Sequence, residues 1–374
     1  MSRRLPVAIT ASIAIVVGAP VVGQLRAAIQ SAVPEQYRLI IGSAIVVAVG
    51  SALVMAIARI RDRRALRYGA LGVSLGVGLI YARLSSTGNP NVDVVERFHF
   101  VEYGLLTWLF YGVWREREDV APIAGPILAA LLVGIGDESL QWFIPARIGE
   151  LHDVMLDGAA AVCGLLFSLG ADPPRLVRLA LDRGRARAAS AFVLATMLCG
   201  AAFFHVVHIG FEIDDGATIF RSRFSADALA AARRDREERW RKEPPLEFHR
   251  WSREDQYLSE GLWHVQRRNE TVSAGDLVAA WRENLIVERF FTPVLDTHTY
   301  ASPEGTRWPA EQRVDMFTRG GGDARVYVSD ANPYPIYTWS IAAFWIAIAV
   351  AAVLAVVCCR ALERRGERER AIAL

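Results

Sequence analysis

The sequence predicts an all-α polytopic membrane protein with about eight transmembrane helices and a mainly α extracytoplasmic domain inserted before the last span. Three observations predict this class. The 374 residues are 53% hydrophobic with a mean hydropathy of +0.24, which is more apolar than a soluble globular protein. Apolar runs long enough to cross a bilayer recur along the chain. One long polar stretch, from about 210 to 337, separates the last two of them.

The spans are predicted from the length of each apolar run, because a hydrocarbon core about 30 Å thick needs roughly 20 apolar residues in a helix. The eight runs lie near 6–24, 39–58, 68–84, 95–114, 121–141, 153–170, 189–209 and 338–359. The fourth and fifth carry charges at one end. Arg3 and Arg4 precede the first run as in a signal sequence, but no clean A-x-A site follows it, so we expect a retained signal anchor rather than a cleaved peptide.

Arginine distribution predicts the orientation of the spans, because positively charged short loops stay in the cytoplasm. With the N-terminus inside, the inner segments hold nineteen arginines and the short outer loops hold five. The five are Arg26, Arg38, Arg83, Arg97 and Arg147. We therefore expect a multi-pass protein with both termini cytoplasmic and residues 210–337 extracytoplasmic. A single lysine among many arginines is typical of GC-rich coding, so we expect the cytoplasmic (inner) membrane of a bacterium.

The spans and the polar stretch divide the chain into five predicted parts. They are an N-terminal two-span segment at 1–66, a membrane core at 67–170, a basic cytoplasmic loop with the seventh span at 171–209, an extracytoplasmic helical domain at 210–337, and the last span with a basic cytoplasmic tail at 338–374.

Composition also excludes several classes of function. The net charge is only +2 and no basic stripe is interleaved with aromatic residues, so we expect no nucleic-acid partner. The four cysteines all lie in apolar runs, which excludes a disulfide framework or a CxxC metal motif. HExxH is absent from the sequence. We expect neither a cofactor nor a bound metal ion, and His205 and His208 are interpreted as packing residues rather than ligands.

Polar residues gather at the predicted outer ends of three neighbouring spans. In the fourth span Glu96, His99 and Tyr103 lie at helical spacing. The fifth span ends with Glu138 and Gln141, and the sixth begins with Asp153 and Asp157. Arg147 lies in the loop between them, where Pro145 disfavours helix and Gly149 permits a turn. These helix ends can converge on one site.

Two interpretations of this convergence stay open. The carboxylates can pair with Arg97 and Arg147 to neutralise charge and pin helices together. A ligand site is favoured by their number, because the four carboxylates exceed these two arginines. The four are Glu102, Glu138, Asp153 and Asp157.

The segments ERFHFVEYGLL, ESLQWFIPAR and DVMLDGAAAVCG, in this order, resemble the VanZ-like family of bacterial membrane proteins over roughly residues 70–170. In that family an acidic-basic pair precedes a histidine and a tyrosine. E-x-x-Q, an arginine after a proline, and D-x-x-x-N leading to glycines follow. The matching residues here are Glu96, Arg97, His99, Tyr103, Glu138, Gln141, Arg147, Asp153 and Gly164.

Three departures from the family pattern stand in the same segments. Asp157 stands where the family usually has asparagine, Ala160 stands at a usual glycine, and Glu96 with Arg97 replaces the more common Asp-Lys. The resemblance implies a link to antibiotic resistance, because the founding members are associated with resistance to teicoplanin, a lipid-bearing glycopeptide. It implies no particular reaction.

The predicted extracytoplasmic domain reads as three helices and one strand. Ser225 is expected to cap a helix that stops at Pro244 and Pro245, Ser252 a second helix, and Ser273 a third. The segment RVYVSD, residues 325–330, is a candidate strand. Trp263, Trp281, Phe290 and Phe291 are candidate core or interface anchors.

Two functions remain after these steps. The first is a non-enzymatic envelope protein that recognises a lipid headgroup, a lipid-linked cell-wall precursor or an amphiphilic glycopeptide. Its ligand site comprises Glu96, Arg97, His99, Tyr103, Glu138, Gln141, Arg147, Asp153 and Asp157. The alternative is an intramembrane acid/base or metal-assisted enzyme acting on an envelope lipid, with Glu138 or Asp153 as general base and His99 or His152 as its partner. Ion-coupled transport ranks last, because the acidic residues cluster at outer ends rather than at mid-membrane.

Overall fold

The computed structural model describes residues 4–86, 88–144, 147–242, 253–296, 305–322 and 326–372. The chain divides into two compact units. The first comprises Met1–Gln141, Gly149–Phe203 and Trp345–Leu374, and the second comprises Trp142–Ile148 and Phe204–Phe344.

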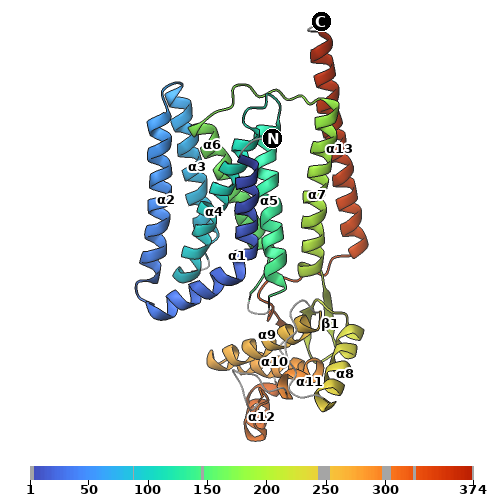
Figure 1. Ribbon diagram of the computed structural model, residues 1–374. Helices are drawn as coiled ribbons and strands as arrows, with labels where there is room; N and C mark the ends of the chain where they lie inside the picture. Colours follow the sequence, from blue (N-terminus) through green and yellow to red (C-terminus); the bar gives the residue numbers. More distant parts are fainter. Residues whose placement is uncertain are drawn as a thin grey trace. The chain divides into compact units, whose positions relative to one another are not determined.

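The first unit is a bundle of long helices whose directions alternate (Figure 1). The helices are α1 (Arg4–Ala32), α2 (Tyr37–Arg59), α3 (Arg64–Leu84), α4 (Pro90–Trp114), α5 (Ala121–Trp142), α6 (Leu151–Ala171), α7 (Arg183–His208) and α13 (Ile341–Ile372). Each predicted span is therefore a helix. Within the described ranges, seven are long and apolar enough to cross a membrane. The eighth, α4, has a polar first half and lies among the others. The predicted all-α polytopic membrane class is confirmed.

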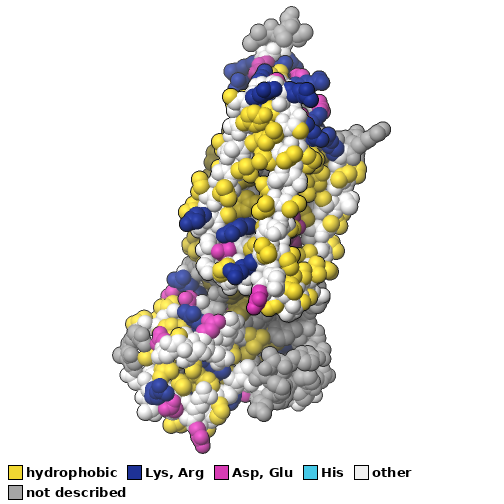
Figure 2. Space-filling view, turned by 90° about the vertical axis from the view of Figure 1, so that its left-hand side faces the viewer, with side chains coloured by type: hydrophobic (Ala, Val, Ile, Leu, Met, Phe, Trp, Pro, Cys, Tyr) yellow, Lys and Arg dark blue, Asp and Glu magenta, His cyan; other side chains and the backbone are white. Residues whose placement is uncertain are grey.

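The surface of the bundle is apolar because its helices keep their hydrophobic side chains on the outside. Along α2, for example, Leu39, Val46 and Val54 are each about 70% exposed. Figure 2 shows one face of these helices as mostly hydrophobic, with charged side chains toward both ends. This pattern matches a lipid environment rather than water.

Helices α4 and α6 pack closest in this unit. On α4, Tyr103, Leu106 and Phe110 recur at helical spacing and are buried against small residues. A Cβ added at Gly164 of α6 would lie 2.7 Å from the Gly104 carbonyl oxygen of α4. Small residues allow such backbone contact between membrane helices.

One end of the bundle, which we call the arginine end, carries the helix termini richest in arginine. Arg67, at the start of α3, donates from Nε to the Gly170 carbonyl at 2.8 Å and from Nη2 to the Ala171 carbonyl at 2.6 Å. These bonds satisfy the last carbonyls of α6. Arg185 of α7 pairs with Asp119 at 2.8 Å. Both chain termini lie at this end (Figure 1).

The second unit is mainly helical and contains a small sheet. Its helices are α8 (Ala226–Lys242), α9 (Arg253–Ser273), α10 (Leu277–Phe290), α11 (Thr292–Asp296) and α12 (Ala310–Met316), which runs into a π-helical turn at Phe317–Gly321. Its core includes Phe220, Tyr257, Ile286 and Phe291, all fully buried.

The sheet has the order β1 (Phe211–Asp214), β2 (Ile219–Ser222), β3 (Val328–Ser329). Strands β1 and β2 form an antiparallel hairpin. Its turn needs Gly216, which has φ +79°, and the Asp215 carboxylate accepts hydrogen bonds from two turn amides. β3 pairs parallel to β2 and lies within the predicted strand at 325–330.

Two of the three predicted helix caps can be tested. The Ser225 hydroxyl accepts from the Ala228 amide at 3.3 Å, as predicted. Ser273 does not cap α10, because α9 continues through it and its hydroxyl donates back to the Asn269 carbonyl. Asp276 caps α10 instead, accepting from the Ala279 amide at 3.2 Å. Ser252 lies outside the described residues.

The α4–α6 contact predicts a contrast between two glycines. Gly164→Ala should lower the free energy of unfolding by about 1–3 kcal/mol, because its methyl group would meet the Gly104 backbone. Gly104→Ala is the matched control, since a Cβ at Gly104 meets nothing within 4 Å. The measurement is denaturant unfolding of the purified protein in micelles, and equal stability of the two variants would contradict the packing.

A second prediction concerns pH and the pair formed by Glu288 and Arg313 in the second unit. Arg313 donates two hydrogen bonds to Glu288, at 2.7 and 2.9 Å. Burial acts to raise the pKa of Glu288, but hydrogen bonds from Arg313 and Asn284 hold it below its usual value. A lowered carboxyl pKa contributes stability above the unfolded pKa, and this contribution is lost as pH falls through the folded pKa.

Glu288→Gln should therefore cost about 1 kcal/mol at pH 7, since partly exposed pairs contribute little. The difference from the wild type should shrink below about pH 4.5. Glu311→Gln, at an exposed position on α12, is the control. Tryptophan fluorescence during denaturation at several pH values measures the free energy of unfolding of each variant. A stability difference between Glu288→Gln and the wild type that does not change with pH would count against the pair.

Candidate functional site

Three helix termini meet at the end of the first unit opposite the arginine end, which we call the polar end. Here α4 begins, α5 ends and α6 begins. The start of α4 is fixed by its cap: Asn89 accepts a hydrogen bond from the Asn91 amide at 3.0 Å, and Pro90 is the first helical residue. Asp93, in the first turn, accepts from the Ser86 hydroxyl at 2.5 Å.

The central contact of the polar end joins His99 of α4 to Asp157 of α6. Nδ1 of His99 lies 2.8 Å from Oδ1 of Asp157. The Asp157 side chain is fully buried, whereas 18% of the His99 side chain is exposed. Nε2 of His99 has no hydrogen-bond partner among the described residues. The carboxylate thus binds the imidazole ring through Nδ1 and leaves Nε2 available for another partner.

Two neighbouring residues shape this pair. Gly134 of α5 leaves room for the carboxylate, because a Cβ there would lie 2.6 Å from Oδ2 of Asp157. The ring of Tyr103 stacks on that of His99, with centroids 6.1 Å apart and planes 4° apart. The Tyr103 hydroxyl and Oδ2 of Asp157 are both buried, and Tyr103 lies close enough to Asp157 to interact with its carboxylate.

Glu138 is the second centre of the polar end and is fully buried. Gln141 donates from Nε2 to Oε1 of Glu138 at 2.9 Å and to Oδ2 of Asp137 at 2.9 Å. The Glu150 amide, just before α6, donates to Oε2 of Glu138 at 3.1 Å. Glu138 therefore joins the last turn of α5 to the first residue before α6.

Glu96 and Asp153 complete the group from the side of α4 and α6. Oε1 of Glu96 lies 4.0 Å from Nε2 of His152. Asp153 is half-buried. It lies within electrostatic reach of Glu96, Glu138 and Asp157.

Two predicted site residues are not brought into this group. Arg97 is exposed, and no ion pair links it to a described carboxylate, so the contacts give no support to charge neutralisation by Arg97. The reason is helical spacing, since Arg97 follows Glu96 and points about 100° away from it. Arg147 lies in Trp142–Ile148 of the second unit, and its role in the site stays a prediction. Pro145 lies outside the described residues.

The structure adds two carboxyl groups that the sequence did not single out. Asp137 is 5% exposed and shares Gln141 with Glu138. Glu150 supplies a backbone donor at the α6 N-cap position. Both lie within the segment GDESLQWFIPARIGE, whose density of polar residues after an apolar run was the available signal.

No three His, Cys, Asp or Glu side chains are arranged to hold a metal ion anywhere in the described ranges. His208 is buried in the second unit, where Nδ1 lies 2.9 Å from the Pro335 carbonyl oxygen, as expected of a packing residue.

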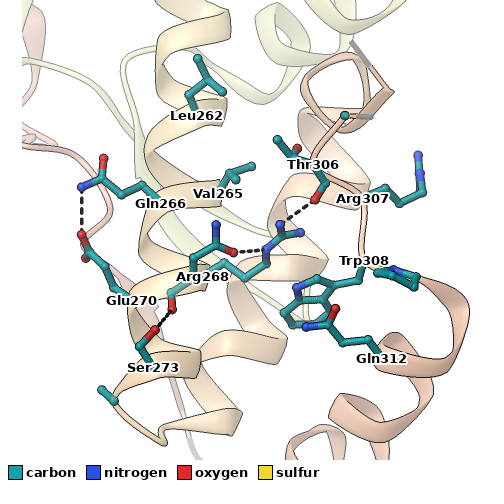
Figure 3. Close-up of a pocket in the computed structure, with 14 residues that line it drawn as sticks. Leu262, Val265, Gln266, Arg268, Glu270, Ser273, Thr306, Arg307, Trp308 and Gln312 are labelled. Atoms are coloured by element: carbon teal, nitrogen blue, oxygen red, sulfur yellow. Dashed lines mark hydrogen bonds between the residues drawn. The ribbon is translucent and has the colours of Figure 1, made fainter. Parts of the chain in front are cut away.

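The second unit contains a separate open pocket of about 1040 Å³ between α9 and residues 305–312 (Figure 3). Arg268 in its wall donates to the Asn284 side chain at 3.0 Å and to the Thr306 carbonyl at 2.6 Å. Its guanidinium lies 4.8 Å from the Trp308 ring centroid. Burial lowers the pKa of Arg268 to about 10. These bonds make Arg268 a brace between α9 and the opposite wall.

Part of the first unit matches a known protein family. Residues 57–171 match the family model described as VanZ/LLP1, and this match covers less than a third of the chain. This segment is VanZ-like. The VanZ-like segment contains α3 to α6 and therefore every residue of the polar end. No curated protein and no solved structure matched the chain.

The contact between α5 and Asp157 predicts a second glycine contrast. Gly134→Ala should displace the Asp157 carboxylate and free His99, because the new methyl group would lie 2.6 Å from Oδ2. Modification of His99 by diethyl pyrocarbonate should then become about tenfold faster, corresponding to roughly 1.4 kcal/mol of lost pairing. Gly136→Ala is the control, since its Cβ would meet nothing within 4 Å. Equal rates in both variants would show that Gly134 does not position Asp157.

Proposed function

We propose that this VanZ-like membrane protein binds the polar head group of an amphiphile at the polar end, which faces the outside of the cytoplasmic membrane. The observation that carries the proposal is the buried His99–Asp157 pair within a group of carboxyl groups. Buried ionisable groups at a membrane helix end are costly and commonly serve a function. Orientation rests on the predicted cytoplasmic location of the arginine end.

The charge balance of the polar end favours a head group that carries an amine. Seven carboxyl groups are contributed by Glu96, Glu102, Asp137, Glu138, Glu150, Asp153 and Asp157. No ion pair links the exposed Arg97 to any of these described carboxylates. An ammonium group would offset their mutual repulsion by pairing with the partly exposed carboxylates of Glu96 and Asp153.

An enzyme is the second candidate, and one observation favours it. His99 is oriented through Nδ1 by a buried carboxylate while Nε2 stays available, which is the arrangement of a general acid–base histidine. Its partner is Asp157, not the Glu138 or Asp153 expected from the sequence. Glu138 is instead occupied by Gln141 and the Glu150 amide.

The binding proposal predicts selectivity between two probes of equal chain length, a fluorescent long-chain alkylamine and the matching alkyl phosphate. The full-length protein in nanodiscs should bind the alkylamine above the level of empty nanodiscs. Asp153→Asn should weaken this binding about tenfold, or roughly 1.4 kcal/mol. Glu35→Gln is the control, because Glu35 is an exposed carboxylate between α1 and α2.

Stronger binding of the alkyl phosphate, or an unchanged affinity in Asp153→Asn, would contradict an acidic amine site. Mass analysis of probe recovered after incubation separates the two candidates. A converted probe that forms with the wild type and not with His99→Gln would favour the enzyme.

A further inference from the structure

Helix α1 changes direction partway along its length. It is one continuous helix over Arg4–Ala32, with Pro20 inside it. Figure 1 shows its first part running along the bundle and its second part running across the polar end toward α2. Proline removes a backbone hydrogen bond and bends helices. A straight helix of this length would extend about 43 Å, well beyond a hydrocarbon core of about 30 Å.

The part after the bend, residues 21–32, has an apolar face and, opposite to it, a polar face. At 100° per residue, Val21, Leu25 and Ile29 fall on one side together with Val22. The opposite side contains polar side chains and small residues, listed as Gly23, Gln24, Arg26, Ala27, Gln30 and Ser31. The span predicted from the sequence, at 6–24, includes only the first residues of this two-faced segment.

Most of the apolar face of this segment is not covered by the rest of the unit, and only Ile29 is half-buried. Val21 is 64% exposed, Val22 59% and Leu25 58%. These exposed side chains form an apolar surface on the segment, which favours an apolar environment over water.

We propose that residues 21–32 form an interfacial helix that lies in the head-group region of the bilayer on the side of the polar end. Two features identify lipid as the occupant. The exposed apolar face continues the hydrophobic surface of the adjoining spans α1 and α2, which faces lipid. Arg26 and the glutamines give the opposite face the polarity expected of a helix lying in the membrane plane.

The test uses the wild-type chain in vesicles of phosphatidylethanolamine and phosphatidylglycerol that contain a photoactivatable phospholipid. One probe carries its diazirine near the glycerol backbone, and the other at the end of the acyl chain. Cross-links are mapped by mass spectrometry. Residues 21–32 should be labelled about fivefold more by the shallow probe, whereas residues 41–55 of α2 should prefer the deep probe.

Two results would overturn the proposal. Deep labelling of 21–32 equal to that of 41–55 would make the segment part of a span. Labelling by neither probe would place it in water or against another protein, including a second copy of the chain. The face is tested by Leu25→Asp, which should reduce shallow labelling about fivefold, and by its control Gln24→Asp, which should leave it unchanged.

Discussion

The hydrogen bond between His99 and Asp157 is the constraint on which the arrangement of the polar end depends. It joins α4 to α6 where Asp157 is fully buried, so an unpaired carboxylate there would be costly. The close approach at Gly164 brings the two helices together, and Gly134 leaves the space that the carboxylate occupies. Helix packing and the position of the carboxylate therefore each depend on a glycine.

The two ends of the bundle differ in how they treat charge. At the arginine end, cations pair with acids and with helix carbonyls, as Arg67 does with Gly170 and Ala171. At the polar end, carboxyl groups are instead contacted by Gln141, by the Glu150 amide and by the histidines His99 and His152. The arrangement at the arginine end is typical of ion pairs and hydrogen bonds that hold helices together. The arrangement at the polar end is the one on which the proposed ligand site rests.

The sequence predicted the helices well because apolar length is a strong local signal. All eight runs became helices, and Glu138 and Gln141 share a contact as their three-residue spacing suggested. The contacts do not support the predicted pairing of Arg97, because sequence proximity to Glu96 says nothing of the face to which a side chain points. The hairpin at 211–222 was missed although FEIDDGATIF has an Asp-Gly turn between alternating residues, a recognised signal. The choice of Asp157 as partner of His99 could not be read from sequence, since it depends on the crossing of α4 and α6.

The central claim is that His99 and Asp157 form one buried pair at the polar end. Solid-state NMR of the protein in bilayers, with ¹⁵N in histidine and ¹³C in aspartate carboxyl groups, measures it directly through dipolar coupling. His99→Gln and Asp157→Asn assign the signal. A hydrogen bond predicts an Nδ1 to carboxyl carbon distance of about 3.5–4 Å. No coupling between these two residues, corresponding to a separation beyond roughly 6 Å, would contradict the pair and the site built on it.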